Sequence, residues 1–248
     1  MLSFRNMRSY RVYSSLSLTI DEQCDLDERA SHHLARVLRV KTGDRLSVFN
    51  GDGNNYQGAI VSATKHQVSV LIDNIEQADT ESSLNTCLAL AVSKGDRFEW
   101  AIKKATELGV TSIVPILSQR VDVRLSPDRW HKKQEHWQQI VISACEQSGR
   151  AVVPSVKEPT TLPQWLSDVE ADCKLVLDPE ATPISIKDQP VSIALLIGPE
   201  GGLAASELTL ASENGFSAMR LGPRVLRTET APLVALSVLG ARWGDINA

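Results

Sequence analysis

The chain has 248 residues, of which 42% are hydrophobic and 23% charged, and its formal net charge is −4. This composition is typical of a globular protein with one large domain or two modest ones, and the slightly negative charge argues against a protein that coats nucleic acid through bulk charge. No apolar run approaches the roughly 20 residues of a membrane-spanning helix, and the first residues lack the apolar segment of a signal peptide.

Local charge departs from this average near the N-terminus. Residues 1–20 carry three arginines and no acidic residue, and residues 29–45 carry five basic residues against Asp44 alone. Such basic stretches are typical of phosphate contacts in RNA-binding proteins, but a solvated surface has the same composition. Charge alone leaves both interpretations open.

The first part of the chain has the pattern of short β-strands. Strands are expected at 45–50, 56–63 and 68–75, with a helical insert at 27–39. This pattern predicts a small β-barrel or sandwich. The polar stretch 76–85 has no periodicity and is the expected linker.

From Thr86 onward, strands and helices alternate. The expected strands are 86–93, 111–117, 174–178, 193–198 and 218–222, and the expected helices are 97–108, 126–148, 204–214 and 228–242. Asp96 is expected to cap the first helix in a capping box with Glu99, and Thr228 or Thr230 to cap the last. The alternation predicts an α/β domain with a mostly parallel sheet and helices on both faces.

The cysteines and histidines do not predict a metal site. Four cysteines are scattered without CxxC spacing, which favours reduced structural thiols in a cytoplasmic protein. His131 and His136 lie five residues apart on an expected helix and do not share a face. We therefore expect no metal.

Two corners of the α/β part carry the strongest functional signal. LLIGPEGG (195–202) and LGPRVLRTETA (221–231) each run from an apolar strand through glycine and proline into a helix. Ligands collect at the carboxyl ends of parallel strands, where helix N-termini and free N–H groups attract negative charge. Each corner alone is either an anion site or a tight turn, and together they predict a cleft for a small cofactor.

Four motifs in one order resemble the ribosomal RNA small-subunit methyltransferase E family of the SPOUT superfamily. They are KGDRFEWAIKKATELGVTSIVPI (94–116), EQSGR (146–150), IGPEGG (197–202) and LGPRVLRTETA (221–231), and MRSYRVY (7–13) is similar to the start of that family. The resemblance implies a PUA-like RNA-binding β-barrel at 1–78 and a SPOUT methyltransferase domain with a deep trefoil knot at 79–248. It also implies a homodimer.

The implied activity is methylation of uridine N3 in 16S rRNA of the small ribosomal subunit, with S-adenosyl-L-methionine as methyl donor, during rRNA processing and ribosome biogenesis. The residues implied to bind this cofactor are Leu177, Leu196, Gly198, Pro199, Glu200, Gly201, Leu221, Gly222, Leu226 and Thr228. Four arginines, Arg8, Arg11, Arg36 and Arg39, are expected to grip RNA phosphates.

Catalysis requires that uracil N3 lose its proton. Arg227 and Arg150 are candidates for holding the uracil oxygens or a phosphate, and Glu146 and Glu229 are candidates for the base or an orienting group. Glu229 is equally well explained as an acid favoured by a helix N-terminus, and Glu146 as an ordinary helix-surface acid. A non-catalytic RNA-binding or ribosome-assembly factor and a phosphate-binding metabolic enzyme are the alternative functions.

Overall fold

A computed structural model describes residues 10–121, 123, 125–182 and 189–246, which form two compact units. The first contains the chain through Glu81 together with Cys145–Val153, and the second contains Ser82–Ala144 together with the chain from Pro154 onward. The boundary expected from sequence, between residues 78 and 79, assigns 145–153 to the second domain, whereas their contacts group them with the first unit. Each unit is described by itself.

The first unit contains a five-stranded sheet. Its strand order is β1 (Tyr10–Tyr13), β3 (Arg45–Phe49), β4 (Asn54–Ala63), β5 (Val68–Gln77) and β2 (Gln23–Asp25). The β1–β3 pair is parallel and the other pairs are antiparallel. The three strands expected from alternation are confirmed, whereas β1 and β2, which are too short for a clear period, were not expected.

One helical segment packs on this sheet, and its end is unusual. The helix α1 (Glu28–His32) starts at Asp27, whose Oδ1 accepts a hydrogen bond from Ala30 N at 2.9 Å, and continues as the π-helical segment η1 (His33–Leu38). The segment ends at Arg39, which has a left-handed φ of 54°. π-turns and left-handed residues other than glycine are uncommon in proteins as a whole, and where they occur they often mark functional sites. The end of η1 is therefore a candidate binding surface of the first unit.

The second unit is built on a parallel sheet, as the alternation predicts. Its strand order is β12 (Ser217–Met219), β10 (Cys173–Leu177), β11 (Ser192–Ile197), β6 (Asn85–Ala91), β7 (Ser112–Leu117) and β8 (Ser155–Val156), with β9 (Thr160–Thr161) also pairing with β7. Every pair is parallel. The carboxyl ends of β10, β11 and β12 therefore meet at one edge.

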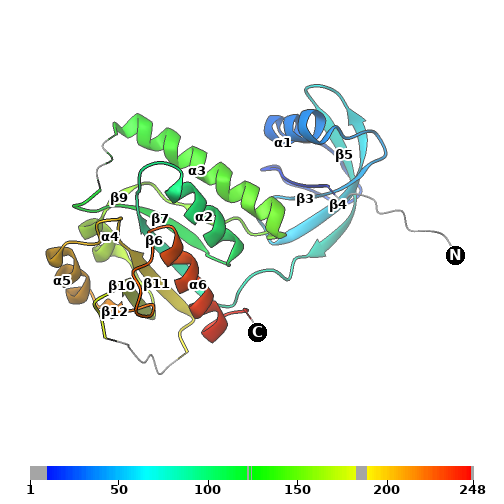
Figure 1. The fold of residues 1–248 in the computed structure, drawn as a ribbon. Coiled ribbons are helices and arrows are strands. Elements are labelled where there is room, and N and C mark those ends of the chain that lie inside the picture. The colour runs from blue at the N-terminus through cyan, green and yellow to red at the C-terminus, as the bar shows by residue number, and fades with distance from the viewer. Residues whose placement is uncertain (1–9, 122, 124, 183–188, 247–248) are drawn as a thin grey trace. The chain divides into compact units, whose positions relative to one another are not determined.

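Helices pack around this sheet (Figure 1). They are α2 (Arg97–Glu107), α3 (Pro127–Ser148), α4 (Leu162–Asp168), α5 (Ala205–Glu213) and α6 (Thr230–Trp243). α2 packs on α6 and, through Phe98, on Trp137 of α3, with ring centroids 4.4 Å apart. α4 and α5 share a core with the strands, in which Trp165 lies 5.4 Å from Phe216. None of the described helices is long and apolar enough to cross a membrane.

Two helix starts differ from their prediction. Asp96 is the N-cap of α2, but its side chain makes no capping bond, so the capping box with Glu99 is wrong. Asp96 already has helical dihedrals (φ −83°, ψ 0°), whereas a capping side chain needs an extended backbone. The N-cap of α6 is likewise Glu229 rather than a threonine, and its side chain makes no capping bond. The deep trefoil knot stays a prediction.

Gly58 gives a direct test of the packing in the first unit. It lies beside a register shift between β4 and β5, and a Cβ at this position would stand 2.5 Å from the carbonyl oxygen of Leu71. Gly58→Ala is expected to lower the free energy of unfolding by about 3 kcal/mol, because the partner atom belongs to a backbone that cannot move aside. Unfolding in urea measures this change in the free energy of unfolding.

The control variant is Gly43→Ala, since a Cβ at Gly43 meets nothing within 4 Å but sits on a backbone with φ +92°. It is expected to cost only about 1 kcal/mol, from backbone strain. If Gly58→Ala and Gly43→Ala lowered the free energy of unfolding equally, the close contact with Leu71 would not be the cause of the loss.

Candidate functional site: a cleft at the carboxyl edge of the parallel sheet

The second unit holds a cavity of about 770 Å³ at the carboxyl ends of β10, β11 and β12. Three segments form most of its wall, 177–180, 197–203 and 219–231, and Arg97 of α2 adds to the rim. Small-molecule sites commonly measure about 300–1,000 Å³, so the cavity has the size of a cofactor site. The two sequence corners thus meet in one cleft.

The first wall is the glycine loop, Gly198–Gly202, which joins β11 to α5. Gly202 has a φ of +68° and its N–H donates to the carbonyl of Pro199 at 2.8 Å, which closes a tight turn. A Cβ at Gly198 would lie 3.0 Å from both the backbone nitrogen and Cγ of Leu203. Glycine is therefore required at 198 by the close approach of the loop to itself.

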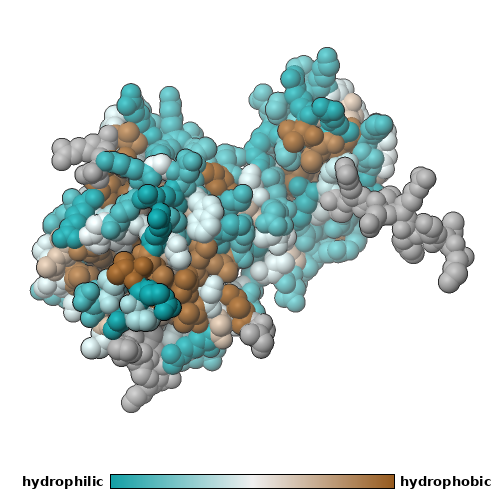
Figure 2. Space-filling view, viewed as in Figure 1, coloured by the Kyte–Doolittle hydropathy of each residue, from teal (hydrophilic) through white to brown (hydrophobic). Residues whose placement is uncertain are grey.

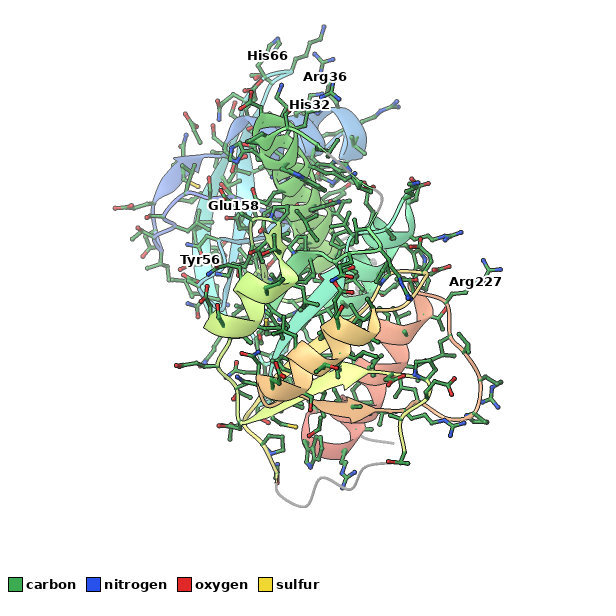
Figure 3. All side chains as sticks on the ribbon, turned by 90° about the vertical axis from the view of Figure 1, so that its left-hand side faces the viewer. His32, Arg36, Tyr56, His66, Glu158 and Arg227 are labelled. Carbon is green, nitrogen blue, oxygen red and sulfur yellow. The ribbon has the colours of Figure 1, made fainter. Side chains whose placement is uncertain are left out.

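The second wall is the segment between β12 and α6. Gly222 has a φ of +76°, and its carbonyl accepts a bond from Arg220 Nε at 3.0 Å. Thr228 is buried, whereas Arg227 is exposed. The side chain of Arg227 extends outward from this loop (Figure 3). Arg227 is thus placed to meet a second ligand from the solvent side.

Glu229 carries an unsatisfied oxygen at this cleft. The residue lines the cavity, and its Oε2 is shielded from solvent without a hydrogen-bond partner among the described residues. A buried polar atom left without a partner costs about 1–3 kcal/mol. The wall of the cleft therefore includes a carboxylate with one oxygen that no described residue satisfies.

The cavity lining includes most of the predicted cofactor residues. Nine of the ten line it, and Leu196 does not; its side chain is fully buried in the core around β11. Arg227 and Glu229 also line it. That these residues bind the cofactor stays a prediction.

Other lining residues were not expected from sequence. Asp178 ends the strand expected at 174–178 and Pro179 follows it, so both lie where ligands collect at the carboxyl ends of parallel strands. Arg97 follows the same rule, because it begins the helix after the strand expected at 86–93, and that strand, β6, pairs in parallel with β11. Its guanidinium lies 3.0 Å from Glu200 of the glycine loop, so the rim contains an ion pair.

Glu146 and Arg150 lie in the first unit. Oε1 of Glu146 accepts from Tyr13 N and from Arg29 Nη2, both at 3.0 Å. Arg150 is 3% exposed, and its Nε donates to Glu81 at 3.1 Å. Each of these two charges therefore has an opposite partner within that unit.

Arg11 contacts the segment that carries Glu146 and Arg150, and its guanidinium donates to three acceptors. Nη1 donates to the carbonyl of Cys145 at 2.5 Å, and Nη2 donates to the carbonyl of Arg150 at 2.8 Å and to Asn55 at 3.1 Å. The guanidinium stacks 3.9 Å from the ring of Phe49. Burial lowers the pKa of Arg11, although an arginine remains charged. The RNA contact predicted for Arg11 competes with these internal bonds.

The thiol of Cys145 is not a nucleophile. Burial is the main cause that raises its pKa to about 11, so the thiol stays protonated at neutral pH. All four cysteines are free, as expected. Among the described residues, no group of three or more His, Cys, Asp or Glu side chains is arranged so that it could hold a metal ion.

Arg36 and Arg39 differ from Arg11 because both are exposed. Figure 3 shows Arg36 at the outer end of the first unit, in the same region as His32 and His66. The turn that carries His66 is tied to the start of α1, since Gln67 Nε2 donates to the carbonyl of Leu26 at 2.8 Å. Arg8 lies outside the described residues. The exposed basic side chains therefore gather around α1 and η1.

Comparison with known proteins agrees with this architecture. Residues 80–240 match a family described as RNA methyltransferase domain, and residues 26–73 match one described as RNA methyltransferase PUA domain. The chain is 34% identical over 241 residues to the ribosomal RNA small subunit methyltransferase E of Buchnera aphidicola from Schizaphis graminum, covering 96% of this chain and 98% of that protein.

Solved structures of related methyltransferases are similar to this chain in both sequence and fold. The Neisseria gonorrhoeae ribosomal RNA small subunit methyltransferase E, solved bound to S-adenosyl methionine, is 36% identical with a TM-score of 0.91, covering 97% of this chain and all of that one. A Legionella pneumophila protein with bound SAM is 39% identical with a TM-score of 0.93, covering 96% and 100%. With its PUA-like and α/β units, the chain belongs to the ribosomal RNA small subunit methyltransferase E family.

Proposed function

We propose that this protein transfers the methyl group of S-adenosylmethionine to N3 of a uridine in 16S rRNA of the small ribosomal subunit. The observation that carries the proposal is the cleft at the carboxyl edge, whose wall combines the glycine loop with Glu229, a residue whose Oε2 has no hydrogen-bond partner among the described residues. The Neisseria gonorrhoeae relative binds S-adenosyl methionine. An rRNA substrate is consistent with the cytoplasmic location expected from the sequence.

The residues of the cleft fit this cofactor. Its volume of about 770 Å³ suits a nucleoside carrying an amino-acid chain. The wall combines apolar side chains such as Leu221 and Leu226 with acidic groups, including Asp178 and Glu229. Carboxylates suit the positive sulfonium and ammonium groups, and the free N–H groups of a glycine loop suit a carboxylate. When bound, the cofactor supplies an activated methyl group.

Glu229 is the proposed base. Uracil N3 carries a hydrogen and is a weak nucleophile until that proton leaves. In the proposed step, Oε2 of Glu229 accepts the N3 proton while N3 forms its bond to the methyl carbon. The freed electron pair of the carbon–sulfur bond stays on sulfur. Arg227, on the solvent side of the same cleft, is proposed to stabilise the negative charge that develops on the uracil oxygens.

Glu146 and Arg150 are weaker candidates for these two roles. Both already have charged partners in the first unit, Arg29 for Glu146 and Glu81 for Arg150. A base that must first release a charged partner loses the energy of that ion pair. Oε2 of Glu229 has no partner among the described residues and therefore loses none.

The first unit is proposed to hold the RNA around the target. The uridine must leave its stack to reach the cleft, so the flanking backbone has to be gripped. Arg36 and Arg39 are exposed, and neither guanidinium has a partner among the described residues. They are therefore the best available phosphate contacts.

The chain is also proposed to form a homodimer through α6. Val238 of α6 and Trp100 of α2 are each 44% exposed, and Leu233 and Val234 are partly exposed. α2 and α6 pack together, and Figure 2 shows apolar atoms gathered over α6. A second copy that covered these side chains would remove a contiguous apolar surface from water.

Nucleoside mass spectrometry tests the function. Deleting the protein is expected to remove 3-methyluridine from 16S rRNA, and adding back the wild-type chain to restore it. Glu229→Gln, which cannot take a proton, is expected to slow methylation by about 100-fold or more while the Kd for S-adenosylmethionine changes less than about threefold. Unchanged 3-methyluridine after deletion would refute the activity and favour an assembly factor.

Gly198→Asp tests the cleft itself. The added side chain collides with Leu203 and distorts the glycine loop, so S-adenosylmethionine binding is expected to be lost. RNA affinity, measured by filter binding, is expected to stay within about twofold because the exposed arginines of the first unit are untouched. An equal loss of both affinities would mean that the substitution only unfolds the protein.

Val238→Lys tests the dimer. A charge in the centre of a buried apolar contact is expected to convert the dimer into a monomer in sedimentation at micromolar concentration. Val191→Lys is the matched control, because Val191 is 67% exposed and lies outside α2 and α6. A wild-type monomer, or a dimer that survives Val238→Lys, would contradict the proposed interface.

A further inference from the structure

Glu207 is a buried carboxylate that the proposed reaction does not use. It lies in the first turn of α5, directly after the glycine loop, and is 5% exposed. Its Oε2 accepts a hydrogen bond from Ala204 N at 2.8 Å, and its Oε1 accepts one from Gln119 N at 2.8 Å. One side chain thus joins the start of α5 to a segment 88 residues earlier in the chain.

The segment it holds, Ser118–Val121, follows β7 and lies against the glycine loop. Nη1 of Arg120 donates to the carbonyl of Gly201, and Nε2 of Gln119 donates to Ser206 Oγ at 3.3 Å. A Cβ at Gly201 would stand 3.4 Å from Cδ of Arg120. The stem of Arg120 therefore lies close to the glycine loop at Gly201.

The bonding pattern requires a carboxylate. Both partners of Glu207 are N–H donors, and only an ionised carboxylate accepts with both oxygens. A glutamine would turn its NH₂ toward one of the two donors. Bonds to a charged acceptor are also stronger than neutral ones, and the N-terminus of α5 favours negative charge.

We propose that Glu207 is a positioning residue that holds the glycine loop in its cofactor-binding conformation by fastening it to Ser118–Val121. This inference rests on the proposed function in that the loop binds S-adenosylmethionine. Glu207 acts through Ala204 and Gln119, because it is absent from the described lining of the cleft. Arg120 supports the same loop from outside through Gly201.

The test compares Glu207→Gln with Glu213→Gln in the full chain. Glu213 is the matched control, since it lies on the same helix but is exposed. Hydrogen exchange of the ligand-free protein is expected to quicken at 118–121 and 198–204 in Glu207→Gln only. The Kd for S-adenosylmethionine is expected to rise about tenfold or more, since at least one charge-assisted bond is lost.

Steady-state kinetics separates positioning from general destabilisation. In Glu207→Gln, the KM for S-adenosylmethionine is expected to rise as the Kd does, while kcat at saturating cofactor and RNA affinity stay within about threefold. Exchange and cofactor affinity equal to those of Glu213→Gln would overturn the proposal.

A second variant covers the case in which Glu207→Gln fails to fold. Arg120→Ala removes an exposed side chain that contacts the loop, and is expected to quicken exchange at 198–204 and to weaken cofactor binding about threefold. Unchanged exchange and affinity would overturn the proposal. If the wild-type chain does not bind S-adenosylmethionine, the proposed function fails, whereas the exchange data still decide whether Glu207 holds the loop.

Discussion

The parallel pairing of β10, β11 and β12 is the constraint on which the functional cleft depends. Parallel strands place their carboxyl ends at one edge, so three loops that are separate in sequence open toward the same space. In an antiparallel sheet, neighbouring strand ends alternate between edges and these loops would part. The cavity therefore follows from strand direction first and from the identity of the loop residues second.

Glycines in the loop between β11 and α5 are needed for the conformation of the loop itself, whether or not a ligand is bound. Gly198 is favoured because a Cβ there would stand only 3.0 Å from Leu203, whereas a Cβ at Gly201 would make ordinary contact with Arg120 at 3.4 Å. A glycine-rich corner in a sequence is usually attributed to close approach of a phosphate or cofactor. Here the chain itself explains Gly198, through its tight approach to Leu203, and Gly202, through its positive φ of +68°. A well-formed loop is what presents its N–H groups to a ligand.

Local sequence patterns predicted the longer elements of both units and missed the shortest ones, which are β1 and β2 in the first unit and β8, β9 and α4 in the second. Strands such as 193–198 and helices such as 126–148 follow from runs of apolar residues, which need no knowledge of distant partners. Strand β1 depends on parallel pairing with β3, more than thirty residues away, and residues 145–153 join the first unit through Arg11 and Phe49. Such long-range contacts leave no period in the sequence. The cleft was predictable because both corners carry strand-to-helix signals, and the turn from β6 to α2 that brings Arg97 to the rim follows the same rule.

The arginines show why charge alone does not identify an RNA-binding surface. Arg11 and Arg36 both lie in basic stretches and have the same side chain, yet Arg11 has three internal acceptors and an aromatic ring beneath it, and Arg36 is exposed. Moving Arg11 to a phosphate would break its bonds to the carbonyls of Cys145 and Arg150, and a surface phosphate contact contributes too little to offset that loss. Arg36 has no such bond to give up among the described residues. The arginines proposed to contact RNA are therefore those that the fold leaves without internal partners, which only the packing of the first unit reveals.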